Sequence, residues 1–170
     1  ITPVTLRKKP DGRYEIVSGH RRKKACELAG MKTVKSEIRE MTRDEAIILM
    51  VESNLQRSTI LPSEKAFSYK MRLEAMNRQG RRDPTSAPLG QKLSREVLAE
   101  QTGDSHSQIQ RYIRLTNLLP GLLELVDEGK IALRPAVELS YLTESEQRDL
   151  LETIGYEDAT PSLGQAIKMR

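Results

Sequence analysis

The chain has 170 residues, of which 37% are apolar and 31% charged, and its formal net charge is +4. It has no Trp and one Phe, which is too few for an aromatic stacking platform. A single Cys excludes an intramolecular disulfide framework and a Cys-rich zinc site. The longest apolar run, six residues at 46–51, is too short for a transmembrane helix. The low cysteine count favours a reduced, cytosolic protein. Because the chain starts at Ile1 without Met, we also expect it to be a fragment of something longer.

The basic character is concentrated in the first half of the chain. Residues 1–80 hold 17 Lys and Arg against 10 Asp and Glu, residues 81–118 hold 6 against 4, and residues 119–170 hold 5 against 10. A positive N-terminal half suits a polyanionic partner. A solvated basic face without a ligand gives the same count, so charge alone leaves both interpretations open.

The first forty residues predict a small α+β unit. Residues 4–8 and 14–18 are β-rich and flank Pro10-Asp11-Gly12, a sequence typical of a turn, so they predict a β-hairpin. A helix is expected over residues 21–29 and a third strand over residues 33–38. This order of strands around one helix indicates an α+β fold.

The sequence Gly19-His20-Arg21-Arg22-Lys23-Lys24, between the second strand and this helix, suits the binding of phosphate. Glycine allows close approach of the backbone, and the first N–H groups of a helix are unpaired donors. The positive end of the helix dipole and the cations add attraction for an anion. The residues alone leave open whether the phosphate belongs to a nucleotide or a DNA backbone, or whether no ligand binds.

Two longer helices follow. Thr42, with Glu45 three residues later, predicts a capping box at the start of a helix over residues 43–55. Pro62 predicts the first position of the next helix, which is followed by a linker rich in Gly, Pro and charge. We therefore expect a first domain over residues 1–80, a linker over 81–91 and a second domain over 92–170.

The second half of the chain predicts only helices. They are expected over residues 95–101, 106–118, 122–128, 135–142 and 144–154. The fold class that follows is α+β, with a small mixed N-terminal domain and an all-α second domain.

Residues 94–118 are a candidate helix-turn-helix. Ala99 is small enough for a close helix crossing, Gly103 suits the tight turn, and Ile109 and Ile113 would anchor the second helix. The other side of that helix carries polar and cationic groups of the kind that read base edges and hold phosphates. The candidate DNA-binding residues are Ser94, Arg95, Ser105, His106, Ser107, Gln108, Gln110, Arg111 and Arg114.

An alternative for this segment is a helical bundle with a polar outer face. The absence of Asp and Glu between Ser105 and Asn117 favours DNA, because carboxylates would repel phosphates. The acidic segment after residue 119 is expected to pack behind the reading helices or to face another protein.

A second polar motif, Ser53-Asn54-Leu55-Gln56-Arg57, lies at a predicted helix end. An Asn oxygen can ligate Mg²⁺ or contact phosphate, and an Arg can clamp phosphate. Alone, such a motif is more often a helix end than a site, but the phosphate-binding sequence at Gly19 to Arg22 strengthens it.

With these features in this order, the chain resembles the ParB family of chromosome and plasmid partition proteins. The resemblance rests on residues 14–22, on Asn54-Leu55-Gln56-Arg57 followed by residues 61–66, and on the helix-turn-helix. It implies an N-terminal CTP-binding domain, a central domain that binds a palindromic, centromere-like site in double-stranded DNA, and a C-terminal dimerisation domain, which we expect to be absent here.

The family also implies how such a protein would act and with what partners. CTP and Mg²⁺ would close a homodimer into a clamp that slides along DNA in plasmid or chromosome segregation. The partner would be a ParA-type ATPase, and the location cytoplasmic, on the nucleoid or a plasmid.

The resemblance implies the residues of the nucleotide site as well. Gly19 to Arg22 would hold the triphosphate, Asn54 would serve the Mg²⁺ side, and residues 1–4 would line the base pocket. The candidate nucleotide-binding residues are Thr2, Pro3, Gly19, His20, Arg21, Arg22, Ser53, Asn54 and Arg57, with Asn54 also the candidate metal ligand.

The chain departs from the family at the residue before Asn54. The family's Glu-Asn-Leu-Gln-Arg reads with Ser53 in place of the glutamate, which is linked to nucleotide hydrolysis in the family. A serine hydroxyl cannot act as a carboxylate base. Glu52 is adjacent but lies about 100° around the helix, so we expect it to point elsewhere. The enzyme expectation is therefore open, between a weak CTPase and none.

Two further departures concern the DNA-binding half. His106 stands where many relatives carry Arg or Lys, and the family's Gly-His-Ala-Arg element reads Arg134-Pro135-Ala136-Val137. We expect a DNA site that differs from the common chromosomal one. The long linker is typical of plasmid or mobile-element versions.

Three alternatives differ in their chemistry. A ParB-like regulator of transcription or replication would keep the fold without nucleotide turnover, which Ser53 suits. A nuclease needs clustered carboxylates for metal ions, and Glu15, Glu27 and Glu52 form no pair at a useful spacing. A sulfiredoxin-like reaction needs a reactive Cys in the phosphate loop, whereas Cys26 lies further along the helix.

Overall fold

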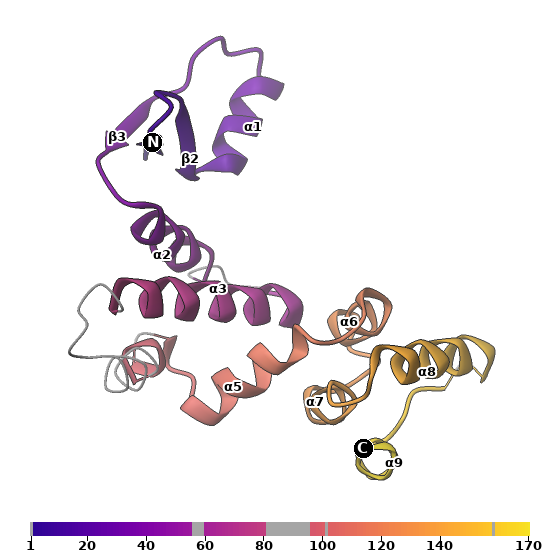
Figure 1. The fold of residues 1–170 in the computed structure, drawn as a ribbon. Helices are drawn as coiled ribbons and strands as arrows, with labels where there is room; N and C mark the ends of the chain where they lie inside the picture. Colours follow the sequence, from indigo (N-terminus) through magenta and orange to yellow (C-terminus); the bar gives the residue numbers. More distant parts are fainter. Residues whose placement is uncertain (1, 56–59, 81–95, 101, 158) are drawn as a thin grey trace.

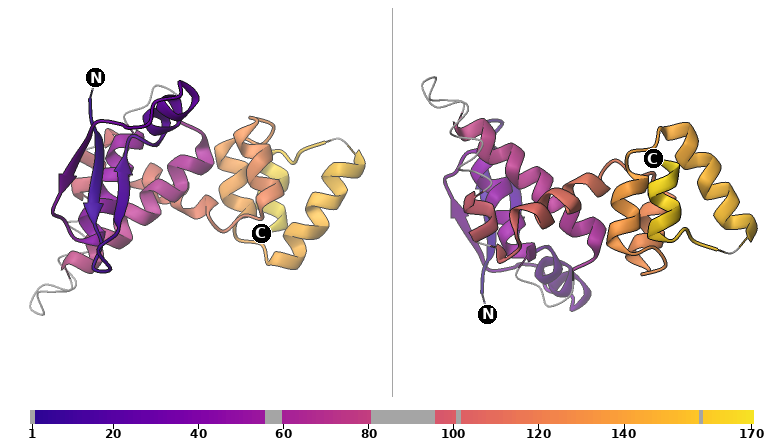
Figure 2. Two further views of the ribbon diagram at one scale, coloured as in Figure 1. Left: turned by 90° about the horizontal axis from the view of Figure 1, so that it is seen from above. Right: turned by 90° about the horizontal axis from the view of Figure 1, so that it is seen from below.

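The computed structural model describes residues 2–55, 60–80, 96–100, 102–157 and 159–170. A small sheet with one helix lies at one end of an elongated molecule, and short helices lie at the other (Figures 1 and 2). The elements are β1 (Val4–Lys8), β2 (Tyr14–Ser18), α1 (His20–Leu28), β3 (Ser36–Arg39), α2 (Arg43–Leu55), α3 (Pro62–Gly80), α5 (His106–Leu115), α6 (Pro120–Asp127), α7 (Leu133–Leu139), α8 (Glu144–Glu157) and α9 (Leu163–Met169). The α+β fold class is confirmed.

The sheet has the strand order β2-β1-β3. β1 and β2 pair antiparallel, which confirms the hairpin, and Gly12 in its turn has φ +79°. β3 pairs parallel to the other edge of β1, so α1 is the crossover between β2 and β3. The third strand covers residues 36–39, shorter than the expected 33–38.

The helices before the linker begin where their capping residues predict. The Thr42 N–H donates to Glu45 Oε2 at 2.6 Å, and the Glu45 N–H donates to Thr42 Oγ1 at 3.3 Å, so the capping box of α2 is confirmed. Pro62 is the first residue of α3, which runs for 19 residues.

Two helix boundaries in the second half differ from the prediction. α5 ends at Leu115 rather than at residue 118, because Thr116 and Leu118 donate to carbonyls three residues back and tighten the chain into a turn. α6 begins at Pro120, two residues early, since proline is tolerated at a first helical position.

The last three helices also depart from the sequence-based boundaries. α7 begins at Leu133 rather than at Pro135, because a first-turn proline needs no N–H partner. α8 runs past Ile154 to Glu157, and α9 was missed. The N-terminus of α9 has a capping box between Ser162 and Gln165, a signal that the sequence contains.

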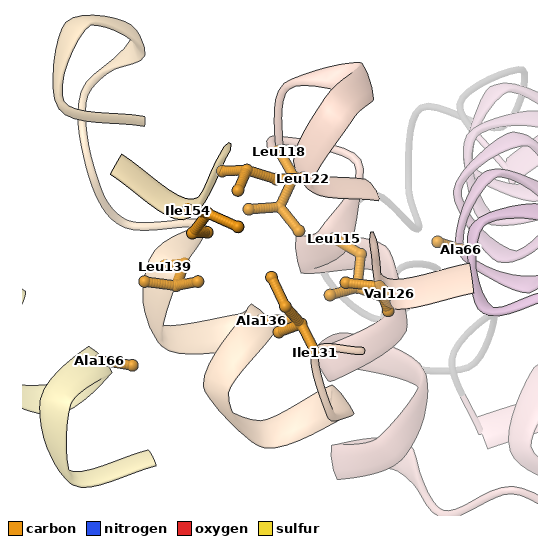
Figure 3. Close-up of a cluster of buried hydrophobic side chains, with 10 residues drawn as sticks. All are labelled: Ala66, Leu115, Leu118, Leu122, Val126, Ile131, Ala136, Leu139, Ile154 and Ala166. Atoms are coloured by element: carbon orange, nitrogen blue, oxygen red, sulfur yellow. The ribbon is translucent and has the colours of Figure 1, made fainter. Parts of the chain in front are cut away.

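The largest buried cluster gathers side chains of α5 to α9 around one apolar centre, with Ala66 of α3 at its edge (Figure 3). A second cluster joins Tyr69 of α3 to Leu98 and Ile109 of the helix-turn-helix segment, and Ala99 packs against it. α3 thus packs against α2 on one side and against α5 and α6 on another. The linker expected at 81–91 lies outside the described residues, and the domain boundaries stay a prediction.

Leu139 tests whether this centre stabilises the fold. It is fully buried, so Leu139→Ala should lower the free energy of unfolding by about 3 kcal/mol through lost burial and a cavity. The control is Leu28→Ala on α1, where Leu28 is 79% exposed and the expected loss is below about 0.5 kcal/mol. Urea denaturation measures both, and equal losses would contradict this assignment of the core.

Candidate functional site

A pocket of about 610 Å³ lies where the end of β2, the start of α1 and the last turns of α2 meet. It brings the two polar motifs of the sequence together although they are separated by some thirty residues. The residues that line it are Val17, Ser18, Gly19, His20, Arg21, Arg22, Met50, Ser53 and Asn54.

Gly19 allows the helix to start this close to the sheet. Its φ is +103°, a conformation that disfavours side chains, and a Cβ there would lie 3.2 Å from Val4 Cα and 3.3 Å from Arg22 Nη1. Gly19 has no side chain to cap α1, and the described residues show no side-chain cap for its first N–H groups. The loop therefore presents backbone donors and the positive end of a helix dipole beside the pocket.

The four cations of the loop divide into two pairs. Lys23 contacts Glu27 at 2.6 Å and Lys24 contacts it at 3.6 Å, and the hydrogen bond from Lys23 lowers the pKa of Glu27. Arg21 and Arg22 line the pocket instead. Within the described lining of the pocket, the positive charge available to a ligand is therefore that of the two arginines, next to His20.

The N-terminal segment is connected to the pocket through Arg22. Its Nη1 donates to the Pro3 carbonyl at 2.7 Å, which fixes the half-buried guanidinium against the backbone. Thr2 and Pro3, both expected in the nucleotide site, are not among the lining residues, although Pro3 orients one that is. Arg57 lies outside the described residues.

Sequence reasoning missed Val17, Ser18 and Met50 in the lining. Ser18 Oγ lies 2.8 Å from Ser53 Oγ, so a hydrogen bond joins the end of β2 to the end of α2 across the pocket. Ser18 stands directly before the loop glycine, and this position in the sequence indicates that it lies at the pocket. Its hydrogen-bond partner could not be inferred in this way, because Ser53 is 35 residues away.

Asn54 lines two pockets. It lines the large pocket and also a smaller one of about 160 Å³, together with Ile60, Glu64 and Ser68. Among the described residues, no group of three or more His, Cys, Asp or Glu is placed to hold a metal ion. A cation beside Asn54 would therefore depend mainly on the oxygen atoms of its ligand.

Glu52 points away from the pocket, as expected. Its Oε1 accepts from Arg72 Nη2 at 2.6 Å, and the Arg72 side chain is only 3% exposed. Burial lowers the pKa of Arg72, and Glu52 opposes that shift. The lining of the large pocket, over the described residues, contains no carboxylate.

The helix-turn-helix segment has the geometry that its sequence predicts. Gly103 in the turn has φ +72°, and Ser105 caps α5 by accepting from the Gln108 N–H at 3.2 Å. Ile109 and Leu115 are fully buried. The exposed candidates for DNA contact on α5 and its cap are Ser105, His106, Ser107 and Arg111, with Gln108 half-buried.

The other candidates from this helix face the protein. Arg114 donates to Ser140 Oγ and to the Ser140 carbonyl, each at 3.1 Å, and its guanidinium lies 3.8 Å from the Tyr141 ring centre. Arg170 lies at 3.8 Å from the same ring. Gln110 Nε2 is buried, and the described residues provide no hydrogen-bond partner for it. Ser94 and Arg95 lie outside the described residues.

Within the described part of the chain, no helix is both long and apolar enough to cross a bilayer.

Comparison with known proteins finds relatives of both halves. The ParB N-terminal domain family matches residues 1–55, and the ParB HTH domain family matches residues 89–160. A chromosome-partitioning protein Spo0J from Thermus thermophilus is 32% identical over 77% of this chain and 42% of its own length. A probable chromosome-partitioning protein ParB from Coxiella burnetii is 30% identical over 91% of this chain and 48% of its own length. The chain spans about half the length of these relatives.

One solved structure shows the same fold. A C-terminally truncated ParB from Caulobacter crescentus, complexed to the centromeric parS site, has a TM-score of 0.56 and 24% identity and covers 99% of this chain and 81% of its own. The same protein complexed with CTP-gamma-S has a TM-score of 0.34, too low for a comparison of folds. With two ParB domain families matched in order along its length, the chain belongs to the ParB family.

Proposed function

We propose that this protein is a DNA-binding partition protein that recognises a palindromic, centromere-like site and binds CTP with Mg²⁺ as a clamp-closing ligand. The observation that carries the proposal is the pocket that joins Gly19–Arg22 to Ser53 and Asn54, in a chain whose separate helix-turn-helix is free to read DNA. Relatives of both halves are named as chromosome-partitioning proteins.

The triphosphate lies on the loop at the start of α1. The N–H groups of the first turn of α1 donate to phosphate oxygens. Arg21 and Arg22 neutralise part of the negative charge of the phosphates. Val17 and Met50 supply an apolar wall. Mg²⁺ would be held by the phosphates and the side-chain oxygen of Asn54, because this ion commonly takes few protein ligands at phosphate sites.

Among the described residues, the lining of this site offers no carboxylate that could act as a base for hydrolysis. Activating a water molecule calls for a base near the γ-phosphate, and the position of the family's glutamate holds Ser53, whose hydroxyl contacts Ser18. Glu52 cannot substitute, because it pairs with Arg72 outside the pocket. The protein therefore binds CTP as a ligand and releases it intact.

DNA is bound by the exposed side of α5. Ser105, His106 and Ser107 at its start lie where a reading helix meets base edges, and Arg111 is placed for phosphate. A palindromic site requires two copies of the chain, so the DNA-bound form is a homodimer. A ParA-type ATPase and a nucleoid or plasmid location follow from the family.

A second candidate is a ParB-like regulator of transcription or replication that has no segregation role. Ser53 favours it, since a regulator needs no nucleotide turnover. The two proposals differ in whether loss of the protein destabilises inheritance of its replicon.

Arginine substitutions test the nucleotide site. Arg21→Ala should weaken CTP binding at least about tenfold, because it removes a charge at the triphosphate, and Arg22→Ala should do so too. The control is Lys24→Ala, since Lys24 is exposed and pairs with Glu27. Isothermal titration with CTP and Mg²⁺ measures all three. Unchanged affinity in Arg21→Ala would overturn the site, because over the described residues the bond to the N-terminal segment is made by Arg22 and not by Arg21.

Substitution of Ser53 tests whether a carboxylate at this position is what CTP hydrolysis requires. The unaltered protein should bind CTP and release no phosphate above the protein-free rate, with or without DNA. Ser53→Glu should introduce turnover, because it places a carboxylate in the pocket, and Ser53→Gln of similar size should not. Phosphate release reports the rate. CTP hydrolysis by the unaltered protein would show that another group acts as the base, which would contradict the proposed role of Ser53.

Two residues test the reading face. Duplexes selected from a random pool by the unaltered protein supply the specific DNA. Gln108→Ala should cost about 1–3 kcal/mol on the selected duplex, and Arg111→Ala should also lower the salt dependence by about one charge. Arg148→Ala on α8, where Arg148 pairs with Glu144, is the control. Equal affinities for all three variants would exclude α5 as the reading helix.

A further inference from the structure

The start of the reading helix is anchored to α3 by one carboxylate. Asp104 lies between Gly103 and the cap residue Ser105. Its Oδ2 accepts from Lys65 Nζ at 2.6 Å and from the Tyr69 hydroxyl, two residues one helical turn apart on α3. The position of the turn is therefore set by two directional bonds from a single helix.

Two tyrosine rings flank the lysine of this contact. Lys65 Nζ lies 4.8 Å from the ring centre of Tyr112 and 5.7 Å from that of Tyr69, and the two rings pack edge to face at 5.9 Å. The side chains of Lys65 and Asp104 are 25% and 18% exposed, and Tyr69 is 1% exposed. Tyr112 belongs to α5. Lys65 of α3 therefore contacts the reading helix itself through Tyr112, as well as the turn before it through Asp104.

The protonation states suit this arrangement. Burial raises the pKa of Tyr69, and the hydrogen bond to Asp104 raises it further, so the hydroxyl stays a donor. Burial also raises the pKa of Asp104, but the hydrogen bonds from Lys65 and Tyr69 outweigh it and the net pKa is lowered. The carboxylate is therefore ionised and accepts both bonds at neutral pH.

A partly buried ion pair adds little stability compared with apolar packing, because desolvation offsets the attraction. Its directional bonds do fix geometry, and here they do so directly before the residues placed to meet DNA. A small rotation of the α5 N-terminus would move Ser105, His106 and Ser107 together. Base-edge contacts need close alignment, while phosphate contacts tolerate displacement.

We propose that Lys65, Tyr69 and Asp104 are positioning residues that set how the reading helix is presented to base edges, without touching DNA themselves. The inference rests on the proposed DNA-binding function and adds a specificity determinant on α3, outside the helix-turn-helix segment.

The test uses a matched pair of tyrosines. Tyr69→Phe removes the hydroxyl that bonds Asp104 and keeps the ring, whereas Tyr112→Phe removes a hydroxyl for which the described residues show no such bond. Asp104→Asn keeps the size of the side chain and removes its charge. Circular dichroism melting sets a temperature at which every variant is folded.

The first readout is the ratio of affinities for the selected duplex and a scrambled duplex. Tyr69→Phe and Asp104→Asn should reduce this ratio about tenfold, with little change on scrambled DNA, and Tyr112→Phe should stay within about twofold of the unaltered protein. A lowered melting temperature with an unchanged ratio would overturn the proposal, because a merely structural role predicts that result.

The second readout needs no DNA. Amide hydrogen exchange over residues 105–110 should be faster in Tyr69→Phe than in Tyr112→Phe, while the amides of α8 exchange equally. If the unaltered protein selects no DNA sequence, the proposed function fails, yet this exchange difference still decides whether α3 holds the helix. Equal exchange in the two variants would contradict the anchor.

Discussion

The two candidate sites depend on the packing of α3. Ala66 and Tyr69 are almost fully buried on this helix, which contacts α2 on one side and α5 and α6 on another (Figure 1). The end of α2 supplies Ser53 and Asn54 to the pocket, and α5 carries the exposed reading face. The helix α3 therefore supports both the α2 wall of the pocket and the proposed DNA-reading surface on α5, which gives it a role beyond connecting them.

The charge around the pocket explains what it is suited to bind. Two arginines and a helix N-terminus attract a polyanion, while the carboxylates in the same region are engaged elsewhere: Glu27 with two lysines and Glu52 with Arg72. Over the described residues, this pairing leaves no carboxylate in the lining of the pocket, which agrees with the proposed binding without hydrolysis. A nucleotide that is bound and not hydrolysed can act as an effector, whose release depends on affinity and concentration.

Local rules made much of the fold predictable. The hairpin turn at Gly12, the capping box at Thr42 and the cap at Ser105 depend on residues within four positions of each other, and all three are present. The end of α5 and the start of α7 were displaced because turns and first-turn prolines allow more than one boundary.

Long-range contacts explain what the sequence could not predict. The pairing of the motifs at Gly19 and Asn54 could be expected from the family resemblance, but the hydrogen bond between Ser18 and Ser53 could not. Arg114 reads as an exposed cation in sequence, and its partners at Ser140 and Tyr141 follow only once α5 packs against α7. Such contacts depend on how elements dock, which side-chain periodicity does not encode.

A crystal structure of this chain grown with CTP and Mg²⁺ would show directly whether the pocket at Gly19–Arg22 and Asn54 holds the nucleotide. We expect intact CTP with its triphosphate on the N–H groups of residues 20–22, Arg21 against phosphate, and the cation beside Asn54. A nucleotide bound elsewhere, a hydrolysed one, or an empty loop at saturating CTP would contradict it.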